Sequence, residues 1–143
     1  MSELRNALLA RLQSLNLGVL HSFERYSTRT KELADCYQFE GRLQGGFLRR
    51  PAAKVLAGGS SGNRQRQSFE LVLFRSWQDG DASQLLFDEQ LDALMADFTN
   101  NHRLNGWSCV DGERLGFELV RNEPAMFAGV LVHYAVLRIS FSR

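Results

Sequence analysis

The side chains best able to do chemistry in this chain are few and lie far apart in the sequence. The three histidines, His21, His102 and His133, have no partner at the spacing that sets two metal ligands on one helix turn or across one hairpin. His133 stands in the middle of an apolar segment, where a histidine is usually a hydrogen-bonded core residue. Cys36 and Cys109 match no CxxC pattern, which indicates reduced, buried thiols of a cytosolic protein. We therefore expect no metal site and no cofactor.

Sequence motifs of catalysis are missing as well. The chain contains no HExxH or GxxxxGKS/T pattern. The GGSSG run at 58–62 could cradle a phosphate only if a helix N-terminus came after it, and here a strand is expected to follow. A flexible loop at the tip of a hairpin is the better interpretation. We expect no catalytic residues, and therefore a protein that is not an enzyme.

Charge is balanced overall but clustered locally. The formal net charge is +1, so no global field draws the protein to DNA or to an anionic membrane, and any DNA contact would be non-specific. The candidate interface residues form one basic and one acidic group: Arg49, Arg50, Lys54, Arg64 and Arg66, and then Asp88, Glu89 and Asp92. Either both groups are solvated surface, the basic one blocking edge-to-edge sheet pairing, or they are complementary patches of a head-to-tail ring.

Length and composition indicate one ordinary globular domain, residues 1–143. The chain is 44% hydrophobic and 23% charged and has two prolines. Its N-terminus is amphipathic with both charge signs, unlike a signal peptide, and no apolar run approaches the ~20 residues of a membrane span. We expect a soluble protein made in the bacterial cytoplasm. Its basic residues are almost all arginine, which suits protein interfaces but also follows from host codon bias.

Two helices and a hairpin must position the charged groups. Leu4, Leu8, Leu12 and Leu15 recur at helical spacing and predict a helix over 3–16. An extended segment over 19–27 and a short helix over 29–38 are expected next. Residues 45–77 then read as a long β-hairpin with its tip at 57–66. Proline in the first arm makes that arm an edge strand, or one bulged at Pro51.

The second predicted helix has the clearest pattern in the chain. Its apolar stripe consists of Phe87, Leu91, Leu94, Met95 and Phe98. Asp81 and Gln84 fit a capping box at its start, and the helix should end near Asn100. Strands are predicted over 106–111, 113–121 and 128–141, the last apolar on both faces and therefore central in its sheet. The fold class expected is α+β, a mixed and largely antiparallel sheet with a long β-hairpin, packed against two main α-helices.

Three segments resemble small tail-completion proteins of bacteriophages. NEPAMFAGVLVHYAVLRISFSR is similar to their closing strand, of the type MFAGVLxHxAxLxL, and GGFLRR is similar to a hairpin start in which tryptophan is frequent at the position of Phe47. ASQLLFDEQLDALMADF resembles their central helix, with matching positions at Ser83, Phe87, Asp88, Asp92 and Phe98. The resemblance covers roughly residues 20–142 and leaves the N-terminal third without a counterpart.

The resemblance implies a structural protein of a phage or prophage, similar to tail terminators. Such a protein would form a homo-oligomeric ring, by family resemblance a hexamer. The ring would end the tail tube, or join it to the head, in the virion tail. Its partners would be itself, the tail-tube protein and a head-completion protein. The alternative that the residues leave open is a small-ligand-binding or regulatory bacterial domain, which predicts an enclosed apolar pocket with a few convergent polar groups.

Overall fold

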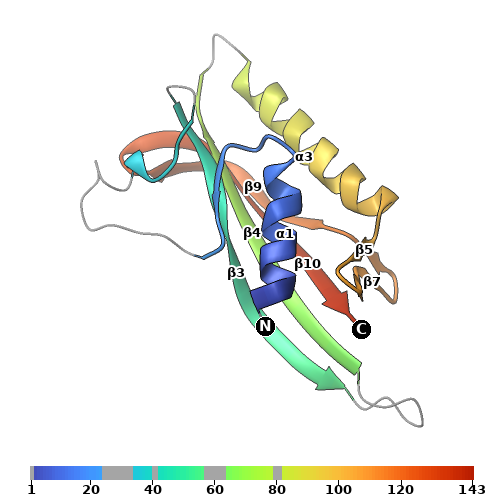
Figure 1. Cartoon of the computed structure of the whole chain (residues 1–143). Coiled ribbons are helices and arrows are strands. Elements are labelled where there is room, and N and C mark those ends of the chain that lie inside the picture. The colour runs from blue at the N-terminus through green and yellow to red at the C-terminus, as the bar shows by residue number, and fades with distance from the viewer. Residues whose placement is uncertain (1, 24–33, 40–41, 57–63, 79–81) are drawn as a thin grey trace.

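A curled sheet with two helices on one face forms the framework of the molecule (Figure 1). The computed structural model describes residues 2–23, 34–39, 42–56, 64–78 and 82–143. The helices are α1 Ser2–Gln13 and α3 Ser83–Asn100. The strands are β1 Val19–His21, β2 Gln38–Phe39, β3 Arg42–Leu56, β4 Arg64–Ser76, β5 Arg103–Leu104, β6 Trp107–Ser108, β7 Val110–Asp111, β8 Arg114–Leu115, β9 Glu118–Phe127 and β10 Val130–Ser142.

The main sheet is mixed, and its longest strands lie next to one another. Its order is β1-β3-β4-β10-β6-β5, with β2 also on β3 and β9 also on β10. β1 runs parallel to β3, whereas the other described pairs are antiparallel. β7 and β8 form a separate two-stranded sheet. β3, β4, β10 and β9 therefore make a four-stranded antiparallel centre, which the short strands extend at its margins.

The predicted α+β class with two main helices is wrong, because strands outweigh helices in the described residues. Strands hold 53% of the described residues, and the sheet curls into a half-barrel. The prediction missed most of β9, because this edge strand is exposed along most of its length and shows no alternation of apolar and polar residues. Nor is the predicted long hairpin shown as a unit. β3 and β4 do pair antiparallel, but residues 57–63 between them lie outside the described residues.

Two apolar clusters cover the two faces of the central strands. On the helix side, the odd-numbered β4 residues Phe69, Leu71 and Leu73 pack with α1, α3 and the odd-numbered residues of β10. On the opposite side, Val72 and Phe74 pack with Val132, Val136 and Tyr37. The expectation that β10 is apolar on both faces and lies inside its sheet is confirmed, since β4 flanks one of its edges and β9 and β6 the other.

Local chemistry explains how β3 bends and how closely its neighbours approach. The register with β4 shifts between Arg49 and Ala52, which confirms the bulge predicted at Pro51. Earlier in β3, a Cβ added to Gly45 would lie 2.0 Å from the Val19 carbonyl oxygen. Only glycine therefore allows β1 to pair with β3 at this point.

The segments before and between these strands agree with the sequence only in part. The first helix is confirmed as α1, with Leu4, Leu8 and Leu12 buried. Of the extended segment 19–27, β1 is described and residues 24–27 are not. Half of the short helix predicted over 29–38 falls outside the described residues; residues 34–35 are helical, and residue 38 already belongs to β2.

The predicted capping box includes Asp81, which lies outside the described residues, and the start of α3 differs from it. Its N-cap is Ala82, in the left-handed conformation, and no side chain among the described residues caps it. The helix is instead fastened by its first residue. Ser83 Oγ accepts a hydrogen bond from the Gln78 backbone N–H at 2.9 Å and lies 2.7 Å from His133 Nε2. A capping box needs a side chain next to the free N–H groups, and here tertiary contacts take its place.

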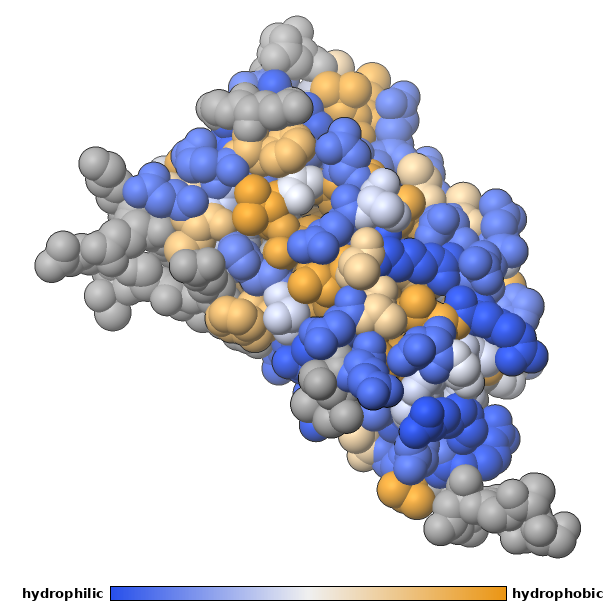
Figure 2. Space-filling model, viewed as in Figure 1, coloured by the Kyte–Doolittle hydropathy of each residue, from blue (hydrophilic) through white to orange (hydrophobic). Residues whose placement is uncertain are grey.

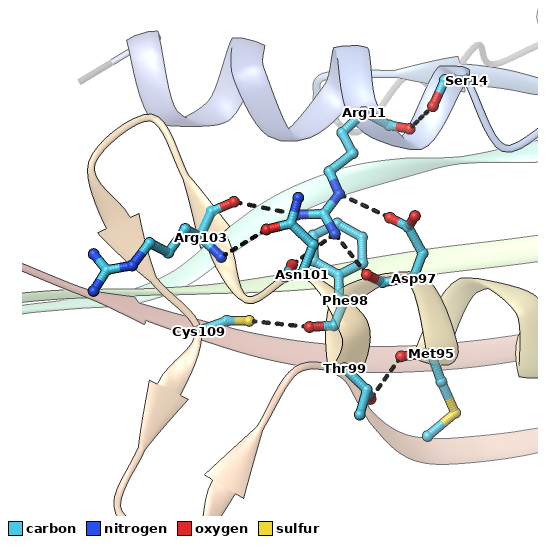
Figure 3. Close-up of polar contacts among 9 residues, drawn as sticks. All are labelled: Arg11, Ser14, Met95, Asp97, Phe98, Thr99, Asn101, Arg103 and Cys109. Atoms are coloured by element: carbon cyan, nitrogen blue, oxygen red, sulfur yellow. Dashed lines mark hydrogen bonds and ion pairs between the residues drawn. The ribbon is translucent and has the colours of Figure 1, made fainter.

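The C-terminal end of α3 is held by a side chain from α1 (Figure 3). The Arg11 guanidinium pairs with the Asp97 carboxylate at 2.8 Å and donates to the backbone carbonyls of Asp97 and Asn101, both at 2.7 Å. It also stacks over the Phe98 ring, 3.8 Å from the centroid. The last turn of α3 has no basic residue of its own. Arg11 thus supplies the positive charge that a helix C-terminus favours and joins the two helices.

Replacing Arg11 by alanine should lower the free energy of unfolding by about 2–3 kcal/mol, because several charge-assisted hydrogen bonds are lost at once. Arg11→Lys keeps the charge but not the planar fork, so it should recover only part of that loss. Urea unfolding measures both variants. Arg103→Ala, which removes an exposed arginine beside the same site, is the control, and an equal effect of the two alanine variants would contradict this role for Arg11.

Candidate interaction surfaces

The three histidines have different surroundings in the fold. His21 Nε2 lies 2.8 Å from the Cys36 carbonyl oxygen, and its ring packs edge-on against Tyr37. His102 is exposed, and His133 is buried. Among the described residues, no group of three histidine, cysteine or carboxylate side chains could hold a metal ion.

Ser83 and His133 have the geometry of a nucleophile and its base, but not the access. Their polar atoms are 2.7 Å apart, and the two residues are only 1% and 4% exposed. The His133 ring stacks between Trp77 and Phe87, at 3.9 and 5.5 Å between centroids. Since Ser83 Oγ already accepts from Gln78, its proton is best placed to donate to Nε2, which leaves the imidazole proton on Nδ1. The pair anchors α3 to β10, and a substrate has no path to it.

Burial also shifts the pKa values of two core residues, His133 and Cys109. Desolvation lowers the pKa of His133, and the nearby Asp88 carboxylate opposes that effect only in part. Desolvation likewise raises the pKa of the Cys109 thiol, whose sulfur lies 3.8 Å from the Phe98 carbonyl oxygen. A protonated, buried thiol is a poor nucleophile and metal ligand. Both groups therefore belong to the core.

The basic residues lie on the face of the sheet that the helices leave open. Arg49 pairs with Glu70 at 3.8 Å, and Glu70 lies on the same face of β4 as the buried Val72 and Phe74. Lys54 stands directly opposite Arg66 in the β3–β4 register, on the same face. The remaining two predicted basic residues take other positions: Arg64 is exposed at the start of β4, and Arg50 lies half-buried in the β3 bulge.

Sequence reasoning missed two arginines that join this basic face. Arg138 of β10 pairs with Glu70 at 3.5 Å, on the side opposite Arg49. Arg114, in β8, borders a pocket of about 170 Å³ together with Lys54, Arg66, Ser68 and Ser140. For Arg138, the only sequence signal was the alternation of side chains along β10, which puts it on the same face as Val136. The location of Arg114 depends on how β8 folds back, and the sequence does not encode that locally.

The acidic residues lie on α3, on the helix side of the sheet. Glu89 and Asp92 are exposed, whereas Asp88 is half-buried and accepts a hydrogen bond from the Asn122 amide of β9 at 3.4 Å. Leu85 lies four residues before Glu89 and is 64% exposed, so the three exposed residues make one ridge along the helix. Hydrophobic atoms are accessible near the start of α3, and farther along the helix the surface is hydrophilic (Figure 2).

The two charged groups therefore face opposite sides of the molecule. The basic group lies on the open face of the sheet, and the acidic ridge points away from the sheet on the covered face. They cannot pair within one chain. Two different complementary surfaces on one subunit generate a head-to-tail contact when copies meet.

The largest cavity described, about 480 Å³, opens where β10 passes from β9 to β6. Its apolar wall consists of side chains from α3, β8 and β9, including Met95, Leu115 and Leu119. Arg114, Arg138 and Glu118 line it as well, so the charged part of the lining has both signs. Leu115 and Leu119 are 43% and 38% exposed, so the mouth of the cavity is partly apolar surface.

Comparisons with known proteins add little. No protein-family model matches the chain, and no curated protein matches it. A solved structure aligns over 99% of this chain and 90% of that chain, at 14% sequence identity and a TM-score of 0.46, and its name states no activity. This likeness is too weak to carry an argument. Neither helix of the described part is long and apolar enough to cross a membrane.

The buried His133 makes stability depend on pH. Because folding lowers its pKa below 6.5, its contribution to stability is complete above about pH 6.5 and is lost as the pH falls through the folded-state pKa. Urea unfolding between about pH 7.5 and pH 5 should therefore show a steeper loss for the wild type than for His133→Gln. His102→Gln, at an exposed site, should follow the wild type. Identical slopes for wild type and His133→Gln would refute this assignment.

Proposed function

We propose that this protein is a structural component of a phage or prophage tail that assembles into a homo-oligomeric ring at the tail end. The observation that carries the proposal is the opposite placement of the two charged groups, with Glu89 and Asp92 on the helix side and Lys54 and Arg66 on the open face of the sheet. Head-to-tail contacts of this kind close into rings when the rotation between subunits permits it.

The phage assignment depends on the three segments that resemble tail-completion proteins, and the fold supplies a reason for two of them. Phe87 and Phe98 of the resembling helix are core residues of α3, and Asp92 lies on its exposed ridge. The resembling closing segment, residues 122–143, spans the end of β9 and all of β10, and β10 has buried residues on both faces. In this function the ring binds the last ring of the tail tube, ends its growth and offers a surface to the head.

Ring formation predicts a salt-sensitive oligomer. The purified chain, alone or with its tail-tube protein, should sediment as a discrete ring at low ionic strength, and the ring fraction should fall as added salt screens the charged surfaces. The double variant Lys54→Glu/Arg66→Glu should weaken assembly, and Arg103→Glu, at an exposed site on β5, should not. A strict monomer at high concentration, both alone and with tube protein, would rule the proposal out.

A second candidate, a small-ligand-binding domain, is favoured by the 480 Å³ cavity. Its apolar wall and Arg114 would suit a ligand with an apolar body and an anionic head. Native mass spectrometry of the purified protein, with and without an added medium-chain fatty acid, tests this candidate. A bound mass that is lost in Arg114→Glu supports it, and no bound mass under either condition removes its support.

A further inference from the structure

The large cavity and the small basic pocket are neighbours, and together we refer to them as the groove. Arg114 and Ser140 line both, so the two spaces meet at these side chains. At one end, Met95, Leu115 and Leu119 make the wall apolar. The other end is basic and is bordered by Lys54 and Arg66. The groove thus changes from apolar to cationic along its length.

The basic end carries cations and hydroxyl groups. Lys54 and Arg66 stand directly opposite each other in the β3–β4 register. Beside them Ser68 Oγ and Ser140 Oγ are 2.8 Å apart. One of these hydroxyls donates to the other, which leaves a second proton free to donate to a ligand. Two cations and a hydroxyl donor fit a carboxylate.

The exposed ridge of α3 carries the matching groups in the matching order. Leu85 comes first, and Glu89 and Asp92 follow on the same side of the helix. Leu85 and Asp92 are about 10 Å apart along the axis, at 1.5 Å per residue. Leu85 is 64% exposed at the end of this acidic ridge, so its side chain is accessible to a partner.

We propose that the groove binds the α3 ridge of a second copy of this chain, with Leu85 in the apolar end and Glu89 and Asp92 at Arg114 and the basic end. This inference rests on the proposed self-assembly and assigns its contact. A nucleic acid would use only the cationic end, since a phosphate backbone has no group to bury beside Leu115. A helix that lays one face into a groove uses both ends.

Charge reversal across the contact tests the assignment. Arg114→Glu should weaken self-association about tenfold or more in sedimentation velocity, and Glu89→Arg should do the same. The double variant Arg114→Glu/Glu89→Arg should restore much of the lost affinity, because the ion pair is remade in reverse. Circular dichroism and urea unfolding of each variant check that it is folded. Glu113→Arg, at the exposed residue next to Arg114, is the matched control and should associate as the wild type does.

The apolar end has its own test. Leu85→Asp should abolish the oligomer, whereas Met126→Ser, at a β9 residue that is 68% exposed, should leave it intact. Rings of normal stability in Arg114→Glu, Glu89→Arg and Leu85→Asp would overturn the inference and leave the proposed function standing. Wild-type protein that never associates would overturn both. Loss of DNA retention in Arg114→Glu, with self-association unchanged, would assign the groove to nucleic acid and also overturn the inference.

Discussion

The pairing of β10 with β4 is the constraint on which the rest of the structure depends. Their register joins eleven residue pairs, from Val132↔Ser76 to Ser142↔Arg66, through the middle of the sheet. Because side chains alternate with a period of two, this register decides which face each residue takes, and a slip of one residue would reverse them all. It buries Leu137 and Leu71 beneath the helices. It also places Arg138 beside Glu70 on the open face, so core and charged surface follow from a single alignment.

The sequence predicts those parts of the fold whose signal is local. Leucines at helical spacing identify α1, the apolar stripe identifies α3, and two-sided apolarity identifies β10 as an inner strand. What it does not predict depends on distant partners. β9 lacks alternation because it is an exposed edge. The start of α3 is held by His133, fifty residues away, and its end by Arg11, more than eighty residues before it, so the local sequence does not show how either end is fastened.

The candidate site likewise has parts that the sequence predicts and parts that depend on distant residues. The acidic ridge is visible in the sequence because one helix carries it, and the basic segment because β3 and β4 adjoin in the chain. Arg138 and Arg114 were missed, since each reaches the basic face only through the sheet register or the folding back of β8. The Ser68–Ser140 pair likewise joins residues 72 positions apart. The sequence alone can therefore identify the charged residues but not the groove.

The two ends of the groove would contribute differently to an assembly. Ion pairs at a partly exposed contact add little net affinity, because desolvation offsets most of the attraction, but they steer encounter and fix orientation. An apolar side chain that moves from water into a cavity adds affinity but does not fix the orientation of the partner. The gain is about 1.5–3 kcal/mol for a leucine that becomes fully buried. A ridge with Leu85 at one end and carboxylates at the other combines both effects. It would fix the rotation from one subunit to the next, and a constant rotation is what a closed ring requires and what distinguishes it from aggregation.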